Sequence, residues 1–346
     1  MSDDAATPVR RPRRPRYRGK NPRRFEEKYK ERDPQRYSET IARVLASGKT
    51  PAGSHRPIMV AEVLEALAPQ PGQVAVDCTL GYGGHAQEIL ARLQPGGRLL
   101  GLDVDPIELP RTEARLRSLG FGPDQFTAHR SNFAGLPQVL AKAGLAGADL
   151  ILADIGVSSM QLDDPARGFS IKHAGPLDMR MNPARGQSAA AFLRKIEAAK
   201  LARVFEENAD EPQAELLATA LAGKVFATTL SLAAAIRVAL PRSSEEAVEL
   251  SVRRVFQALR IAVNDEFSSL DAFLRQLPLC LTPDGRVAVL TFHSGEDRRV
   301  KKSFAAGARE NLYSEIAGEV IRPSIAERNA NPRSAPAKLR WARKAA

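Results

Sequence analysis

The segment from Val74 to His85 constrains the fold more than any other part of this chain. It begins with a short apolar run, typical of a parallel strand that is covered on both faces, and Asp77 ends that run. Glycines at positions 81, 83 and 84 then allow the backbone to turn sharply and to approach a ligand closely. A helix expected over 86–93 directs its free N–H groups at the same turn. The segment therefore predicts an α/β sheet with a ligand at the carboxyl end of this strand.

A second acidic strand end narrows the class of ligand. The apolar run Arg98–Asp103 ends about 20 residues beyond the glycine turn, where an acid binds ribose hydroxyls in nucleotide-binding folds. The turn lacks the third glycine of the dinucleotide pattern, so it has no need to hold a pyrophosphate. A single ribose without phosphate suits S-adenosylmethionine. Two alternatives remain: an ordinary tight β-to-α turn, and a nicotinamide-dependent oxidoreductase, which the incomplete glycine pattern disfavours.

Further strands alternate with helices along the chain. Strands are expected at 126–129, 149–154 and 286–291, and helices near 58–67, 113–119, 136–143 and 295–304. This alternation predicts a doubly wound parallel sheet with helices on both faces. Because the carboxyl ends of parallel strands meet at one edge, we expect Asp77, Asp103 and Asp154 to lie along that edge.

The region after Asp154 departs from this alternation. A long polar loop is expected over 155–165, and its length suggests a functional loop over the ligand edge. From about 189 to 240 the sequence is rich in Ala and Leu at helical spacing, which predicts a helical insertion. The pattern from Val252 to Leu277 predicts one very long helix or a bent one. The stretch 323–346 is expected to be either a loop packed on the domain or a contact with RNA.

The basic excess of the chain is concentrated in its first 50 residues. The formal net charge is +11, and this segment holds 15 Lys+Arg against 7 Asp+Glu. Residues 8–24 are rich in Pro and Arg and are expected to be disordered, whereas 25–45 suits one or two short helices. The segment is either an RNA-binding arm that uses phosphate contacts and stacking or a solubilising tail, and the sequence favours neither.

The positions of cysteines, histidines and apolar runs bear on the cellular compartment of the protein and on whether it binds a metal. Cys78 and Cys280 each lie in an apolar run, which is typical of a reduced cytoplasmic protein. No apolar run of about 18 residues exists, so no membrane span is expected. The histidines show no ligand spacing with one another or with the cysteines, so no metal is expected. The oligomeric state is not indicated, and a dimer is left open.

Six blocks of the chain together resemble one enzyme family. They are 77–85, 103–106, 154–164, 175–181, 254–264 and 292–301. Blocks such as Gly-Pro-Leu-Asp-Met-Arg-Met are far more specific than one glycine turn. In these blocks the chain resembles the bacterial 16S ribosomal RNA (cytosine-N4) methyltransferases, the ribosomal RNA small subunit methyltransferase H family. The likeness extends from about residue 55 to the C-terminus.

This resemblance implies a Rossmann-like fold that uses S-adenosyl-L-methionine to methylate N4 of a cytidine in 16S ribosomal RNA on the small subunit. The division that it suggests is a methyltransferase domain over 55–165 and 250–346 and a helical insertion, the RNA platform, over 166–249. A basic tail over 1–54 completes the chain and looks like an addition to the family pattern.

The cofactor contacts of the family fall on seven positions of this sequence. Carried over residue by residue, they are Gly83, Gly84, His85, Asp103, Phe133, Asp154 and Gln161. The resemblance implies that Asp103 binds the ribose and that Phe133 lies beside the adenine.

The chemistry points to Asp154 as the candidate catalytic residue. A cytosine N4 amine is a weak nucleophile because its lone pair is delocalised, so the enzyme must align it with the sulfonium methyl and stabilise the developing charge. A carboxylate at the sheet edge such as Asp154 is expected either to accept a hydrogen bond from the amine or to contact the cofactor, and the sequence does not decide which role dominates. The base must also leave its stack, and either Phe169 or Phe292 is expected to support it. A core position is favoured for Phe169, and a structural role is favoured for His293.

Some positions depart from the family pattern. Met160 stands where Pro is usual, Gly295 where Leu is usual, and the acidic segment 207–215 replaces a basic, aromatic one. These departures leave open a methyltransferase with a different RNA target, or a ribosome-assembly factor that binds RNA without turnover. Arg180, Arg254 and Arg260 are the cations expected to help the insertion bind RNA.

Overall fold

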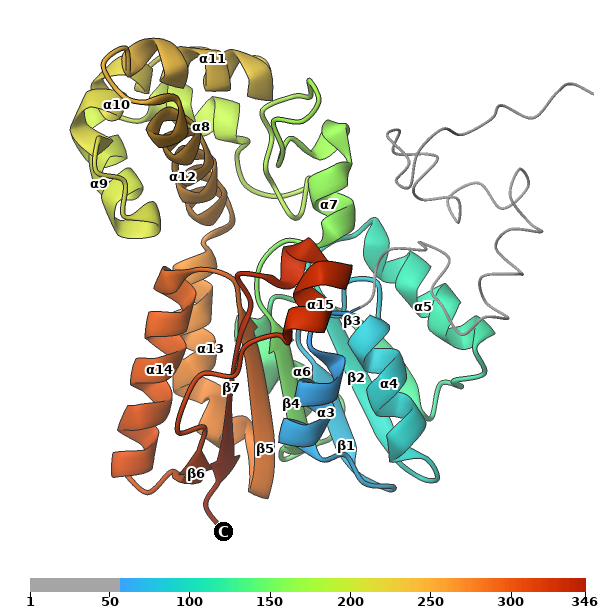
Figure 1. Cartoon of the computed structure of the whole chain (residues 1–346). Helices are drawn as coiled ribbons and strands as arrows, with labels where there is room; N and C mark the ends of the chain where they lie inside the picture. Colours follow the sequence, from blue (N-terminus) through green and yellow to red (C-terminus); the bar gives the residue numbers. More distant parts are fainter. Residues whose placement is uncertain (1–56) are drawn as a thin grey trace, which may run out of the picture. The chain divides into compact units, whose positions relative to one another are not determined.

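The computed structural model describes residues 57–346, which belong to one compact unit (Figure 1). The expectations for residues 1–56, including short helices and RNA contacts, lie outside the described residues. The strands are β1 (Val74–Asp77), β2 (Arg98–Asp103), β3 (Phe126–Arg130), β4 (Ala148–Asp154), β5 (Leu281–Thr291), β6 (Tyr313–Ile316) and β7 (Lys338–Lys344). The helices around the sheet are α3 (Val60–Leu67), α4 (Gly84–Leu93), α5 (Glu108–Ser118), α6 (Leu136–Lys142), α13 (Glu266–Cys280), α14 (Ser294–Arg309) and α15 (Ile325–Ala330).

The seven strands form one sheet in the order β3-β2-β1-β4-β5-β7-β6. The first five are parallel, and β7 is antiparallel to both of its neighbours. The register places Asp77 beside Gly101 of β2 and Leu152 of β4, so the carboxyl ends of these strands meet at one edge. The expectation that the acids at the strand ends share an edge is therefore confirmed.

Alternate residues of the central strands pack on opposite faces of the sheet. On β4, Ile151 and Ala153 belong to an apolar cluster that includes residues of α6, α13 and α14, whereas Leu150 and Leu152 belong to one that includes residues of α3, α4 and α5. Each Leu or Ile buried in this way contributes about 1.5–3 kcal/mol to folding. With helices on both faces, the sheet is doubly wound, as the sequence predicts.

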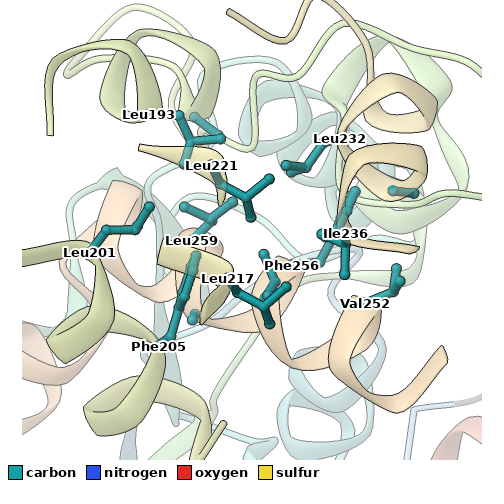
Figure 2. Close-up of a cluster of buried hydrophobic side chains, with 14 of the residues drawn as sticks. Leu193, Leu201, Phe205, Leu217, Leu221, Leu232, Ile236, Val252, Phe256 and Leu259 are labelled. Atoms are coloured by element: carbon teal, nitrogen blue, oxygen red, sulfur yellow. The ribbon is translucent and has the colours of Figure 1, made fainter. Parts of the chain in front are cut away.

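Five helices between β4 and β5 form an apolar cluster of their own, called the helical cluster below. They are α8 (Ala189–Lys195), α9 (Ala198–Ala209), α10 (Ala214–Leu221), α11 (Thr229–Ala239) and α12 (Glu245–Asn264). Figure 2 shows side chains from all five pointing toward one another, among them Leu193, Phe205, Leu217, Ile236 and Leu259. The Ala- and Leu-rich stretch thus buries its apolar faces within the helical cluster, as a helical insertion requires.

Side-chain caps divide this stretch into separate helices. Ser188 Oγ accepts the Ala191 N–H before α8, and Thr228 forms a capping box with Ser231 before α11. The Ser244 side chain accepts the Ala247 N–H before α12. Each cap replaces a missing backbone bond and stabilises its helix by about 1 kcal/mol. Cap residues therefore account for where these three helices begin.

The long pattern from Val252 to Leu277 forms two helices. Asp265 has a left-handed backbone with φ 52°, which ends α12 and begins α13. Pro278 lies inside α13 and does not terminate it, since the helix continues to Cys280.

Two segments that were expected to be loops contain regular elements, whereas the RNA contact at 323–346 stays a prediction. The stretch 323–346 contains β7, whose Leu339 and Ala342 are buried between β5 and β6. Its cations are used inside the protein, because Lys338 and Arg340 both bind Asp297. The expected loop at 155–165 contains a short helix, α7 (Ser159–Asp163), and a 3₁₀ turn, η3 (Pro165–Arg167).

Candidate functional site

Asp103 binds the glycine turn from the end of β2. Its Oδ2 accepts the N–H of Gly81 at 2.8 Å, and its Oδ1 accepts the N–H of Asp105 at 2.9 Å. Asp77 at the end of β1 accepts the N–H of Thr79 at 3.1 Å. Burial raises the pKa of Asp77 to about 6, and that of Asp103 likewise to about 6. Within residues 57–346, no Lys or Arg forms an ion pair with either carboxylate.

Asp154 lies at the end of β4 beside His85. Its backbone N–H donates to Thr79 Oγ1 at 2.6 Å, and its Oδ2 is 3.8 Å from His85 Nδ1. Burial, and then the negative charge of Glu296, raise the pKa of Asp154 to about 7, although 27% of the side chain is exposed. Burial lowers the pKa of His85, and its Nε2 lies 2.9 Å from the carbonyl oxygen of Ile58. A neutral His85 that donates to this carbonyl presents an unprotonated Nδ1 to Asp154.

The glycine turn has the geometry that its sequence predicts. Gly81 and Gly83 have φ of +50° and +75°, in the left-handed region that glycine adopts readily. A Cβ on Gly83 would lie 2.9 Å from Thr112 Cγ2, and one on Gly84 would lie 2.7 Å from Pro57 Cγ. Close packing against α5 and the segment before α3 therefore requires these glycines, independently of any ligand.

Gln161 is bound within the protein. Its Nε2 donates to Asp105 Oδ2 at 3.0 Å, its Oε1 accepts the N–H of Ser158 at 3.0 Å, and the residue is buried. Arg167 donates to the same carboxylate oxygen of Asp105. Neither Asp105 nor Arg167 is among the expected site residues, although Asp105 lies within the block 103–106 and Arg167 just beyond the block 154–164. The sequence feature that could have identified Asp105 is that it is a second acid, two residues after Asp103.

Phe133 lies just after β3 in a 3₁₀ turn, η2 (Phe133–Gly135), which Asn132 caps. Its ring is half-buried and meets the ring of Phe273 edge to face, with centroids 5.5 Å apart. The ring is thus held by α13 at the same edge as Asp103. The structure brings five expected positions, Gly83, Gly84, His85, Asp103 and Asp154, to the edge formed by β1, β2 and β4.

A pocket of about 250 Å³ separates the 162–179 segment from α12. It is lined by Leu162, Phe169, Met179, Val252, Phe256 and Arg260, with four further residues. Phe169 is buried there, whereas Phe292 is half-buried at the end of β5. A larger hollow of about 410 Å³ includes Arg98 at the amino end of β2, away from the acidic edge, so we assign it no chemistry.

The acidic segment 207–215 holds helices together. Asn208 donates to the carbonyl of Ala258, and Glu211 is buried and accepts a hydrogen bond from Ser251. Asp210 accepts one from Ser294 and lies 3.6 Å from Arg298. Much of the acidity that departs from the family pattern therefore serves contacts with α12 and α14.

Residues 57–346 contain no group of three His, Cys, Asp or Glu side chains arranged to hold a metal ion. In the same part of the chain, no helix has the length and apolar character that a membrane span requires.

Known proteins match this chain over nearly its whole length. The family model described as the MraW methylase family matches residues 52–345. The "Ribosomal RNA small subunit methyltransferase H 1" of Lachnoclostridium phytofermentans is 49% identical over 342 residues, 96% of this chain and 93% of that protein. The corresponding protein "H 2" of Alkaliphilus metalliredigens is 49% identical over 345 residues, 97% of this chain and 98% of that protein. Among solved structures, TrmN from Thermus thermophilus is 14% identical with a TM-score of 0.40, covering 90% of this chain and 52% of that one, too weak a likeness to support an argument.

The coverage also corrects one expectation. These two relatives leave only 3–4% of this chain unmatched, too little for the tail over 1–54 to be wholly an addition. The tail is therefore largely shared with them.

Proposed function

Because the chain belongs to the MraW methylase family, we propose that it methylates N4 of a cytidine in the 16S RNA of the small ribosomal subunit, in the cytoplasm. The methyl donor is S-adenosylmethionine. The observation that carries the proposal is the acidic strand edge, where Asp77, Asp103 and Asp154 lie together in a chain so similar to ribosomal RNA methyltransferases.

The charge of this edge fits the donor. Burial raises the pKa values of all three carboxyls, so their charges are poorly compensated by the residues around them. A sulfonium cation would lower the cost of ionising them, whereas the pyrophosphate of a dinucleotide would raise it. The edge therefore favours S-adenosylmethionine over a nicotinamide dinucleotide.

Each carried-over residue has a distinct part in this proposal. Asp103 accepts hydrogen bonds from the ribose hydroxyls, and Phe133 lies against the adenine. Gly83 and Gly84 let the turn approach the cofactor, and His85 stands beside Asp154. Gln161 supports the ribose side through Asp105, because both ends of its side chain already bind protein groups.

Asp154 acts on the cytosine amine. Its carboxylate accepts a hydrogen bond from N4, which increases the electron density on nitrogen and aligns it for in-line attack on the methyl carbon. S-adenosylmethionine would supply the methyl group and leave as neutral S-adenosylhomocysteine. Asp154 would take the proton that the methylated amine loses and pass it to solvent. A pKa of about 7 suits a group that must accept and release a proton near neutrality.

The helical insertion over 166–249 serves as the RNA platform in this proposal, and the remainder of 55–346 as the methyltransferase domain. The flipped cytosine lies against Phe292, which is half-buried, because Phe169 is already buried by its neighbours.

The test is methyl transfer from labelled S-adenosylmethionine to small subunits isolated from a strain that lacks this protein. Nucleoside analysis of the RNA identifies the product. We expect N4-methylcytidine with the wild-type protein and almost none with Asp154→Ala. Asp124→Ala, which changes an exposed aspartate, is the matched control and should retain activity.

Two results would overturn the proposal. A different methylated nucleoside would reject the acceptor, and wild-type protein that binds the cofactor without labelling the subunits would reject the substrate or turnover itself. In the second case, binding to the subunits would favour the assembly-factor alternative.

A further inference from the structure

A buried charged cluster lies where α12 and α13 meet the start of α14. Arg260 donates two hydrogen bonds to Glu266, each at 2.9 Å, and its Nη2 lies 3.8 Å from Glu296. His293 Nε2 lies 3.0 Å from the same oxygen of Glu296. These charged groups come from three elements: Arg260 from α12 of the helical cluster, Glu266 from α13, and His293 and Glu296 from the start of α14.

Glu296 is the least exposed member, at 1%. Its Oε2 accepts the N–H of Phe292 at 2.8 Å, which holds the backbone turn that follows β5. Its Oε1 makes no hydrogen bond of good geometry, although His293 and Arg260 are near. Burying a carboxylate whose charge is only partly compensated costs several kcal/mol, so this arrangement is not explained by stability alone.

The turn held by Glu296 adjoins Asp154. Asp154 pairs with Leu290 in the register of β4 and β5, and the next residue, Ile155, donates its N–H to the carbonyl of Leu290. Glu296 thus lies at the β5 side of Asp154, opposite His85 and Asp77. Its negative charge contributes to the raised pKa of Asp154.

We propose that Glu296 is a positioning residue for methyl transfer: it fixes the turn that carries Phe292, and its charge makes Asp154 a stronger proton acceptor. This inference rests on the proposed function for the identity of the reaction. Arg260 supplies a counter-charge to Glu296 from α12. Glu296 therefore interacts both with a cation of the helical cluster and with Asp154 at the acidic edge.

The charge effect is tested without activity, by ¹³C NMR titration of Asp-labelled full-length protein, with Asp154→Asn used to assign the Asp154 signal. Glu296→Gln keeps the shape and the acceptor for the Phe292 N–H but removes the charge. We expect the Asp154 midpoint to fall from about 7 by roughly 1 unit and to remain above 3.8, because burial still acts. The ionisable side chains that act on Asp154 or lie beside it are Asp77, His85 and Glu296, and the Asp label reports Asp77 in the same spectra.

Asp297→Asn is the matched control. Asp297 is the next residue on α14 and pairs with Lys338 and Arg340, but its charge is not among those that raise the pKa of Asp154. An Asp154 midpoint that moves no further in Glu296→Gln than in Asp297→Asn overturns the charge role.

The positioning effect is tested by Glu296→Asp, which keeps the charge but shortens the reach to Phe292. We expect an Asp154 midpoint near the wild-type value together with at least a 10-fold slower single-turnover methyl transfer at saturating cofactor. In Glu296→Gln the pH profile of the transfer should move in the same direction as the NMR midpoint. A wild-type rate of methyl transfer in Glu296→Asp would overturn the positioning role. This measurement does not depend on Glu296→Gln, so it decides the positioning role even if Glu296→Gln does not fold. Absence of methyl transfer in the wild-type protein would instead reject the proposed function. The NMR titration would still test whether the charge of Glu296 acts on Asp154.

Discussion

Arg167 donates a hydrogen bond from Nη1 to Oδ2 of Asp105 across 2.7 Å, and both side chains are buried. The other end of the guanidinium donates to the carbonyls of Arg180 and Met181, at 3.1 and 2.7 Å. Asp105 follows the end of β2, whereas Met181 leads toward the helical cluster. The pair therefore connects the ribose side of the proposed cofactor site to the segment that begins the insertion.

Arg167→Met should destabilise the protein strongly. The substitution leaves Asp105 as a buried carboxylate with one cationic partner removed, a change that costs about 3–5 kcal/mol. Equilibrium urea unfolding measures the loss. We also expect weaker cofactor binding, because Asp105 and Asp103 share the backbone turn after β2.

Arg92→Ala is the control for that experiment. Arg92 pairs with Glu88 one turn away on α4, but its side chain is 44% exposed, so the pair is worth less than about 1 kcal/mol. Equal losses in the two variants would show that burial of the Asp105 pair has no energetic consequence.

Much of the sheet could be predicted because its central strands are short apolar runs, and three of them, β1, β2 and β4, end in an acid. Val74 to Val76 and Leu150 to Leu152 carry this pattern without interruption, so both the strands and the shared edge follow from sequence. Strand β7 could not be found in the same way. Its buried Leu339 and Ala342 are surrounded by cations that look solvent-exposed until Asp297 is placed beside them.

The candidate site shows the same limit. A carboxylate at a strand end is local information, and Asp103 and Asp154 were identified from it. The role of Glu296 depends on Arg260 and His293, which come from different elements and meet only after folding. Gln161 was identified by resemblance, but only the structure shows that its amide binds Asp105.

Affinity for S-adenosylmethionine should fall as the pH decreases from 8 to 5. The pKa values of Asp77 and Asp103 are about 6 and that of Asp154 is about 7, so protonation removes negative charge from the site across this range. A sulfonium cation loses attraction when that happens. Isothermal titration calorimetry at several pH values measures the effect.

S-adenosylhomocysteine provides the comparison, because its sulfur is uncharged. Its affinity should change less over the same pH range. Parallel curves for the two ligands would mean that the strand-end carboxylates do not respond to the charge on sulfur.

Gly83→Ala should impair both folding and cofactor binding. Gly83 has φ +75°, and an added Cβ would lie 2.9 Å from Thr112 Cγ2, so the variant combines backbone strain with a clash. We expect a loss of about 1–3 kcal/mol of stability and a displaced glycine turn. Thermal unfolding with and without S-adenosylmethionine separates the two effects.

Gly72→Ala is the control that introduces backbone strain without a steric clash. Gly72 has φ +82° with nothing within 4 Å of an added Cβ, and it lies before β1 at the opposite end from the acids. It should lose about 1 kcal/mol of stability and keep its cofactor affinity. If Gly83→Ala behaves like Gly72→Ala, contact with α5 is not what requires the glycine.

Asp154→Asn should stabilise the protein while ending its activity. Burial raises the folded-state pKa of Asp154 from 3.8 to about 7, so the folded state holds this proton more tightly than the unfolded state. Unfolding therefore becomes easier as the pH rises from about 4 to 7, and the penalty is constant above 7. The amide carries no such penalty, so the excess stability of the variant should grow over that range, to on the order of 4 kcal/mol. Urea unfolding of both proteins at pH 4.5, 6 and 8 measures this, with Asp124→Asn as an exposed control that should follow the wild type. If the stability difference between Asp154→Asn and the wild type is independent of pH, Asp154 has the same pKa in the folded and the unfolded protein. The structure would then give no reason for Asp154 to be a strong proton acceptor for the amine.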